Sequence, residues 1–333
     1  AAGIEEGVFE PTQQFYDPGY AIVDGVRIKD WKAGGHGQET FWEVFQNSCN
    51  PGFVEIGRRL GKDKLFKYIN DFGFGKKTNV DLLGESTGIV FNTDVIGNVE
   101  VATSAFGQGN SVTPIQLVNA ASAAVNGGNL HTPYILKGFG IENTIIYQYD
   151  KKLVRRVISE ETSKIVAEGL ERVVALGTGR GAYINGYRVG GKTGTAQIAI
   201  DGHYASGQYI LSFLGIAPMD KAELAVYIGL TKPKANIQYG GVIVGPMIRE
   251  VLAESLNIMG IEKRYDGIPY EPRPWVDRAL FVVDNYVGMK KSSISFHPHY
   301  QLRIEGTGTT IIAQLPEAGE YIIQDGIVTL FTD

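Results

Sequence analysis

The sequence is poor in cysteine, since its 333 residues include only one, Cys49. A single cysteine cannot form a disulfide within the chain. Zinc sites built on thiolates usually use several cysteines, or cysteine together with histidine. The 5 histidines are scattered, and the closest pair, His297 and His299, is separated by Pro298 and has no acidic residue next to it. The sequence therefore predicts neither a metal site nor a cofactor.

Long apolar runs and long basic runs are also missing. No stretch approaches the roughly 20 apolar residues that a membrane-spanning helix requires. The net charge is -5, which argues against a nucleic-acid partner, because phosphates need a positive face. We expect no signal peptide in the first residues either, since Ala1 opens directly into what reads as the end of a helix, stopped by Gly7. We therefore expect further polypeptide upstream of Ala1 in the complete protein.

The hydrophobic pattern that is present predicts helices first, then strands, then a last helix. Asn50 is expected to cap one helix, with Pro51 at its first position, and Thr113 and Ser159 open two others. Three strand-like runs joined by short turns favour an antiparallel meander, so the fold class is α+β. The expected helices cover residues 39–47, 50–60, 63–72, 113–127, 159–177 and 246–259, and the strands cover 192–200, 209–217 and 224–230.

Composition divides the chain into two predicted domains. Residues 1–262 hold all of the strong helices and the meander. Residues 263–279 carry Pro269, Pro272 and Pro274 among charged side chains and are typical of a linker. Residues 280–333 are mostly β with glycine-rich turns, and they are too few for a large core. We interpret them as a small appended binding module.

Two short motifs could carry chemistry, Ser48-Cys49-Asn50 between two helices and Lys192-Thr193-Gly194-Thr195 at the start of an edge strand. Acyl transfer through a serine ester requires a nucleophile, a base, a proton relay and an oxyanion hole. The Ser48 hydroxyl can relay a proton to a leaving amine. The Asn50 amide can hold a substrate carbonyl and a neighbouring lysine. Lys192 supplies a positive charge that polarises Ser48 and attracts a substrate carboxylate.

The other residues of the second motif would bind substrate. Thr193 and Thr195 can donate hydrogen bonds to the carboxylate, and the backbone N–H of Thr195 is a candidate oxyanion donor. Gly194 has no Cβ, so a substrate backbone could lie along the strand as an added β partner.

Each motif also has a simpler explanation. Ser48 and Asn50 could act only as helix caps, and Lys192 could be a solvated lysine that protects a sheet edge. Cys49 could be a small buried residue or a reactive thiol. His36, in a glycine-rich loop, fits a structural role better than that of a base. Only the ordered combination of the motifs favours catalysis.

The chain resembles class B penicillin-binding proteins, whose second and third motifs are of the S-x-N and K-T-G type. The resemblance covers roughly residues 1–260 and includes further stretches in the family's order: residues 31–37, 47–51, 72–75, 106–109, 113–117 and 190–196. It implies the transpeptidase fold shared with serine β-lactamases, an antiparallel sheet flanked by helices. It also implies a peptidoglycan D,D-transpeptidase that acts on stem peptides and is acylated by β-lactams.

The family's first motif, S-x-x-K, supplies the acylated serine, and it is not found at the family's position in this sequence. The resemblance places it just upstream of Ala1, so the chain by itself is expected to be inactive and to need the N-terminal part of the same protein. The alternative is a catalytically inactive module that binds peptidoglycan or β-lactams. A β-lactamase is disfavoured, because no device that activates water can be assigned.

Residues 280–333 resemble a single PASTA module, although its usual helix would fall on residues 292–299, which Pro298 interrupts. One such module points to the sporulation type of class B enzyme and to spore cortex synthesis. The resemblance implies an extracytoplasmic protein attached to the cell or forespore membrane by an upstream anchor, with a glycosyltransferase partner. Sporulation-type relatives can carry a second cysteine where Asp30 stands here, so a disulfide with Cys49 is not available.

Overall fold

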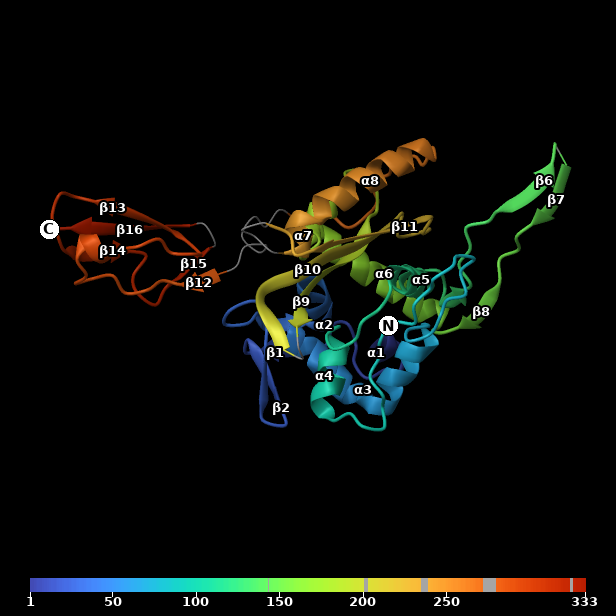
Figure 1. Cartoon of the computed structure of the whole chain (residues 1–333), viewed down its shortest axis with the longest axis horizontal. Helices are drawn as coiled ribbons and strands as arrows, with labels where there is room; N and C mark the ends of the chain where they lie inside the picture. Colours follow the sequence, from blue (N-terminus) through green and yellow to red (C-terminus); the bar gives the residue numbers. More distant parts are fainter. Residues whose placement is uncertain (143, 201–202, 235–238, 272–279, 324–325) are drawn as a thin grey trace.

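A three-stranded antiparallel sheet forms the centre of the computed structural model (Figure 1). The structure describes residues 1–142, 144–200, 203–234, 239–271, 280–323 and 326–333. The strands are β9 (Gly190–Ile200), β10 (His203–Ala217) and β11 (Leu224–Thr231), in the order β11-β10-β9. The predicted antiparallel meander is thus confirmed, and β9 lies at an edge, with β10 as its one partner among the described strands.

Helices cover both faces of this sheet because successive side chains of β10 point to opposite sides. Leu211 and Phe213 pack with Ile248 of α8 (Gly245–Ile258) on one face. Leu214 and Ile216 pack on the other face with α5 (Pro114–Val125) and α6 (Glu160–Ala175). The predicted caps Thr113 and Ser159 open α5 and α6, each accepting a bond from a backbone N–H of the first turn. The α+β fold is confirmed.

The N-terminal third of the chain builds the wall opposite β9. The helix α2 (Phe41–Asn47) begins with a capping box formed by Thr40 and Glu43. The next helix, α3 (Asn50–Asp71), changes direction at Gly61, whose φ of 74° is left-handed, which explains why two helices were predicted there. The neighbouring elements are α1 (Ala2–Glu5), β1 (Gln14–Asp17), β2 (Tyr20–Val23), β3 (Val26–Lys29), β4 (Gly37–Thr40) and α4 (Asn98–Ala105).

One helix cap differs from the prediction. Asn50 is the first residue of α3, and its cap is Cys49, whose Sγ accepts a hydrogen bond from the Gly52 N–H at 3.4 Å. Asparagine is the commoner cap, but the backbone N–H of Asn50 donates to Asp30 Oδ1 at 3.0 Å, and this long-range bond fixes where the helix begins.

Smaller elements surround this core. An arm formed by β6 (Gly138–Ile141) and β7 (Thr144–Gln148) extends from it in Figure 1. The rest are β5 (Asn129–His131), β8 (Leu153–Arg156), η1 (Arg180–Ala182) and α7 (Gly240–Ile243). No helix within the described part of the chain is both long and apolar enough to cross a membrane.

Residues 280–333 form their own small core around Val328 and Leu330, with Tyr286, Tyr300 and Ile311. In the described part of this segment the only helical element is the 3-10 turn η2 (Lys291–Ser293), so the α component expected of a PASTA-like module is not observed there. Pro298 lacks the N–H that a helix over residues 292–299 would need. The strands are β12 (Leu280–Val282), β13 (Gln301–Glu305), β14 (Ile311–Leu315), β15 (Tyr321–Ile323) and β16 (Ile327–Thr332).

The first part of the predicted linker contacts the larger body. The ring of Tyr270 stacks on Tyr183, with centroids 4.5 Å apart, and the Glu271 N–H donates to the Ala175 carbonyl. The remainder, residues 272–279, lies outside the described residues.

Candidate active site

Ser48 lies in the sharp turn that connects α2 to α3. It ends α2 in the left-handed conformation, with φ 58° and ψ 41°. Only glycine and asparagine adopt this conformation easily, and for other residues it costs about 1–2 kcal/mol. Cys49 is fully buried directly after it. The turn therefore buries Cys49 and directs the Ser48 hydroxyl toward the edge of the sheet.

Lys192 approaches Ser48 from the other side of the site. Its Nζ donates to Ser48 Oγ at 2.6 Å and to the Thr193 carbonyl at 3.2 Å. Burial among the elements around β9 lowers the pKa of Lys192 to about 8. The two predicted motifs, separated by 144 residues, are thus in direct contact. A solvated edge lysine would not show such a contact.

Each of the two threonines that flank Gly194 makes a side-chain hydrogen bond. Thr193 Oγ1 lies 3.1 Å from Thr178 Oγ1, and Thr195 Oγ1 accepts a hydrogen bond from the Gly240 N–H at 3.4 Å. A Cβ at Gly194 would collide with the hydroxyl of Ser212, which is the cross-strand partner of Gly194 on β10. Glycine at this position therefore has a packing reason in addition to the predicted space for substrate.

Asn50 follows the Ser48 turn, but its side chain makes its hydrogen bond to β3. Its side-chain Nδ2 donates to the Lys29 carbonyl at 3.2 Å, which connects α3 to the end of β3. This contact ties Asn50 to β3, and the predicted role in holding Lys192 gains no support from it.

Supporting residues to which the sequence analysis gave no role lie around the loop. The indole of Trp31 donates to the Asn47 carbonyl at 2.9 Å, and its ring meets the edge of Tyr239, with centroids 5.9 Å apart. Thr178 also connects β9 to α2, since its N–H donates to the Gln46 carbonyl. The resemblance to the family already included the stretch that begins at Trp31, but no local pattern could have identified Thr178 or Tyr239, which only the tertiary fold brings to the loop.

The site combines a hydroxyl, a lysine ammonium and an open strand edge, as a carboxylate-recognising acyl-transfer site requires. The family model described as "Penicillin binding protein transpeptidase domain" matches residues 1–253. This chain belongs to that family. Transpeptidase function and penicillin binding are therefore the family's shared properties, and the fold and the contacting motifs agree with it.

Individual relatives give the same assignment. The chain is 48% identical over 335 residues to stage V sporulation protein D of Bacillus subtilis, a match that covers 99% of this chain and 52% of that protein. It is 28% identical over 218 residues to the probable peptidoglycan D,D-transpeptidase PenA of Neisseria gonorrhoeae, covering 66% of this chain and 36% of the relative. The chain thus spans about half, or less, of the length of these curated relatives.

Solved structures share the fold. Penicillin-binding protein 3 of Mycobacterium tuberculosis, crystallised with ampicillin, matches with a TM-score of 0.72 and 30% identity over 80% of this chain and 61% of that one. The apo transpeptidase domain of penicillin-binding protein 3 from Burkholderia pseudomallei matches with a TM-score of 0.70 and 27% identity, covering 79% and 77%.

Proposed function

We propose that this chain supplies the second and third motifs of a peptidoglycan D,D-transpeptidase that works through a serine acyl-enzyme and is acylated by β-lactams. The observation that carries the proposal is the 2.6 Å hydrogen bond from Lys192 Nζ to Ser48 Oγ. It joins the two walls of an acyl-transfer site at the open edge of β9, where an extended peptide can be added to the sheet.

In this proposal the serine of an S-x-x-K motif, upstream of Ala1, attacks the carbonyl carbon of the D-Ala-D-Ala peptide bond. The C–N bond breaks, and the terminal D-Ala leaves as an amine that takes its proton through Ser48. The amine of a neighbouring stem peptide then attacks the serine ester and releases the enzyme. The developing oxyanion is stabilised by backbone donors that include the Thr195 N–H.

The remaining residues position the substrate. Lys192 attracts the terminal carboxylate, and the hydroxyls of Thr193 and Thr195 donate to it. Asn50 orients a substrate carbonyl, and Gly194 lets the peptide approach β9 closely. Each role follows from the residue's chemistry and its place around the contact between Ser48 and Lys192.

We further propose that the protein acts in spore cortex synthesis from the outer face of a membrane, held there by an upstream anchor and paired with a glycosyltransferase. The match to stage V sporulation protein D over 99% of the chain supports this role. The proposed division is a transpeptidase domain over 1–262, a linker over 263–279 and a PASTA-like module over 280–333. The separate core of that module supports the last boundary.

The first experiment measures the second-order rate of acylation by a fluorescent penicillin, in protein extended upstream to include the nucleophile. We expect Lys192→Ala to reduce this rate by on the order of 2–4 kcal/mol of transition-state stabilisation, about 30–1,000-fold. Lys221→Ala is the matched control, because its side chain is 84% exposed on the turn after β10, and it should react normally. A normal rate for Lys192→Ala would refute the proposed role. Failure of the extended wild type to react would favour the inactive binding module.

A further inference from the structure

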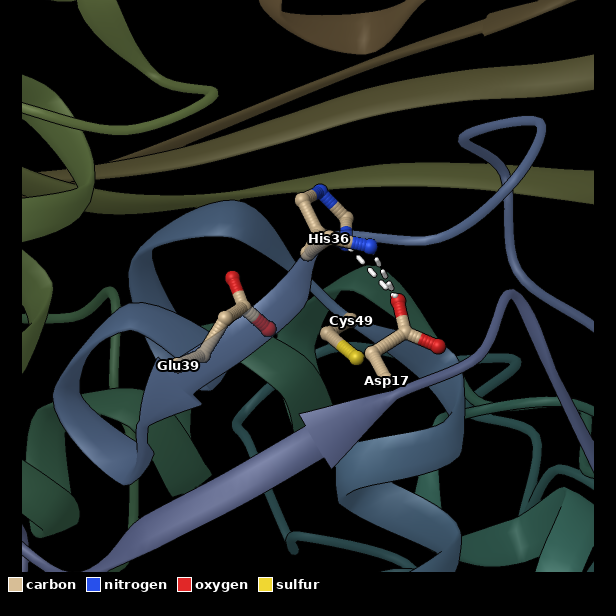
Figure 2. Close-up of side chains that lie close together, drawn as sticks. All are labelled: Asp17, His36, Glu39 and Cys49. Carbon is tan, nitrogen blue, oxygen red and sulfur yellow. Dashed lines mark hydrogen bonds and ion pairs between the residues drawn. The ribbon is translucent and has the colours of Figure 1, made fainter.

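A buried group of ionisable side chains lies directly beneath the Ser48 turn. We define the Cys49 cluster as Asp17, Asp30, His36, Glu39 and Cys49. Four of them converge in Figure 2, from the end of β1, from β4 and the loop before it, and from the start of α3. Asp17 and Cys49 are 0% exposed and Glu39 is 4% exposed. The side chains of Asp30 and His36 are 0% and 6% exposed.

Hydrogen bonds within the cluster do not satisfy all of its polar atoms. His36 Nδ1 lies 3.0 Å from Asp17 Oδ2 and 2.8 Å from Asp30 Oδ2. One ring nitrogen carries one proton at most, so it cannot serve both carboxylates. His36 Nε2 and Glu39 Oε2 are buried without a hydrogen-bond partner, and Asp30 Oδ2 has only the contact with His36 Nδ1 that it shares with Asp17. Each such atom costs about 1–3 kcal/mol, and native proteins seldom leave several together.

The charges of the cluster are also unbalanced. Three carboxylates face one imidazole, and uncompensated buried charge is expensive. A bound cation would balance this charge, because it stabilises deprotonated carboxylates and thiolate as ligands. A bound cation would therefore both give the unsatisfied atoms a partner and balance the negative charge.

We propose that the Cys49 cluster binds one divalent transition-metal ion, with zinc as the ion that suits it best. Donor atoms of Asp17, His36, Glu39 and Cys49 all lie within 4.8 Å of one another, so small side-chain rotations bring them to zinc-bond lengths of about 2.0–2.3 Å. Cys49, His36 and Asp17 supply three ligands. The fourth is Glu39, whose Oε2 is buried without a hydrogen-bond partner, or Asp30, whose Oδ2 has only the shared contact with His36 Nδ1. A mixed set of sulfur, nitrogen and oxygen donors favours zinc over magnesium or calcium.

The ion would have a structural role, because four protein ligands leave no open position for a reacting water. Cys49 stands between Ser48 and Asn50, and Asp30 Oδ1 accepts the N–H of Asn50 at 3.0 Å. Metal binding would therefore fix the turn that presents Ser48 to Lys192. The cluster residues would act as positioning residues for that turn. A metal ion at this site would depart from the expectation, drawn from the sequence, that the chain holds no metal.

The decisive measurement is the zinc content of the protein, purified without chelators and without a polyhistidine tag. We expect close to one zinc per wild-type chain, by elemental mass spectrometry, and loss of most of it in Cys49→Ser and in His36→Asn. The matched control is His131→Asn, a histidine of β5 outside the cluster, which should retain the wild-type zinc content.

Two further measurements keep the test valid if a variant folds poorly. Cobalt(II) in place of zinc should give the wild type a sulfur-to-metal charge-transfer band that Cys49→Ser lacks. Added zinc should raise the Tm of the chelator-stripped wild type, because only the folded state holds the preformed site, and should leave that of a folded Cys49→Ser variant unchanged. For the fourth ligand, at least one of Asp30→Asn and Glu39→Gln should weaken zinc binding.

A wild-type protein that binds no zinc on reconstitution would overturn the proposal. Equal zinc content in wild type, Cys49→Ser and His36→Asn would also overturn it, since the metal would then sit elsewhere. None of these readouts depends on acylation, so the result is independent of whether the protein is a transpeptidase.

Discussion

At the residue scale the conformation of Ser48 is what needs explaining. A serine at φ 58° is strained, and in the structure this strain accompanies a 2.6 Å bond to Lys192. Strained residues persist where the surrounding structure holds them, often at functional sites. Here the buried Cys49 and the start of α3 hold the turn. The simpler explanation of Ser48 as a cap at the start of a helix does not hold, because Cys49 caps α3 and Ser48 ends α2, and it does not explain where the hydroxyl points.

The lowered pKa of Lys192, about 8, predicts how acylation depends on pH. Above that pH the ammonium loses its charge and attracts the carboxylate of a penicillin less, so the acylation rate should fall as the pH rises through 8. In Lys192→Arg the guanidinium stays charged, and the decline should move to higher pH. The measurement is the pH profile of the second-order acylation rate of the extended protein.

The contribution of Lys192 to the free energy of unfolding should rise with pH while the acylation rate falls. Between pH 8 and the ordinary lysine pKa of 10.5, the unfolded state binds more protons at this position than the folded state. The contribution of Lys192 to the free energy of unfolding therefore rises with pH across that window. For the pH profile of acylation, a second-order acylation rate that stays constant up to about pH 10 would contradict the charge-based role of Lys192.

At the element scale the sequence predicted most of the secondary structure, because the local signals were physical ones. Thr113, Ser159 and the short turns between strands place helices and strands by capping and by connection length. The start of α3 was off by one position, because the bond from Asn50 to Asp30 spans 20 residues and leaves no local trace. Positions fixed by distant partners are the ones that local reasoning misses.

The capping box of α2 provides a prediction at this scale, because α2 carries Ser48 at its end. Thr40 Oγ1 accepts from the Glu43 N–H at 3.3 Å, and the Thr40 N–H donates to Glu43 Oε2 at 2.7 Å. Thr40→Ala should lower the free energy of unfolding by about 1 kcal/mol, measured by urea denaturation. Thr40→Ser retains the hydroxyl and should cost much less. Equal losses in the two variants would show that the lost methyl group, not the cap, is responsible.

At the scale of the whole molecule, two distant segments meet at the candidate site. Ser48 and Lys192 are 144 residues apart, and their meeting was expected only from the resemblance to a known family. The Cys49 cluster was not foreseen at all. Its members stand at positions 17, 30, 36, 39 and 49, on strands, loops and a helix start, and this spacing matches no local metal motif. Only the packing of β1, β4 and α3 against one another brings them together.

The last prediction concerns what the chain can do by itself. The sequence has no S-x-x-K motif at the family's position, so residues 1–333 should not be labelled covalently by a fluorescent penicillin, even at high concentration. Protein extended upstream to include the motif should be labelled, and unlabelled penicillin should compete. The measurement is in-gel fluorescence after denaturation, which detects only covalent adducts. Labelling of residues 1–333 alone would mean that a nucleophile within this chain, with Ser48 the first candidate, forms the acyl-enzyme.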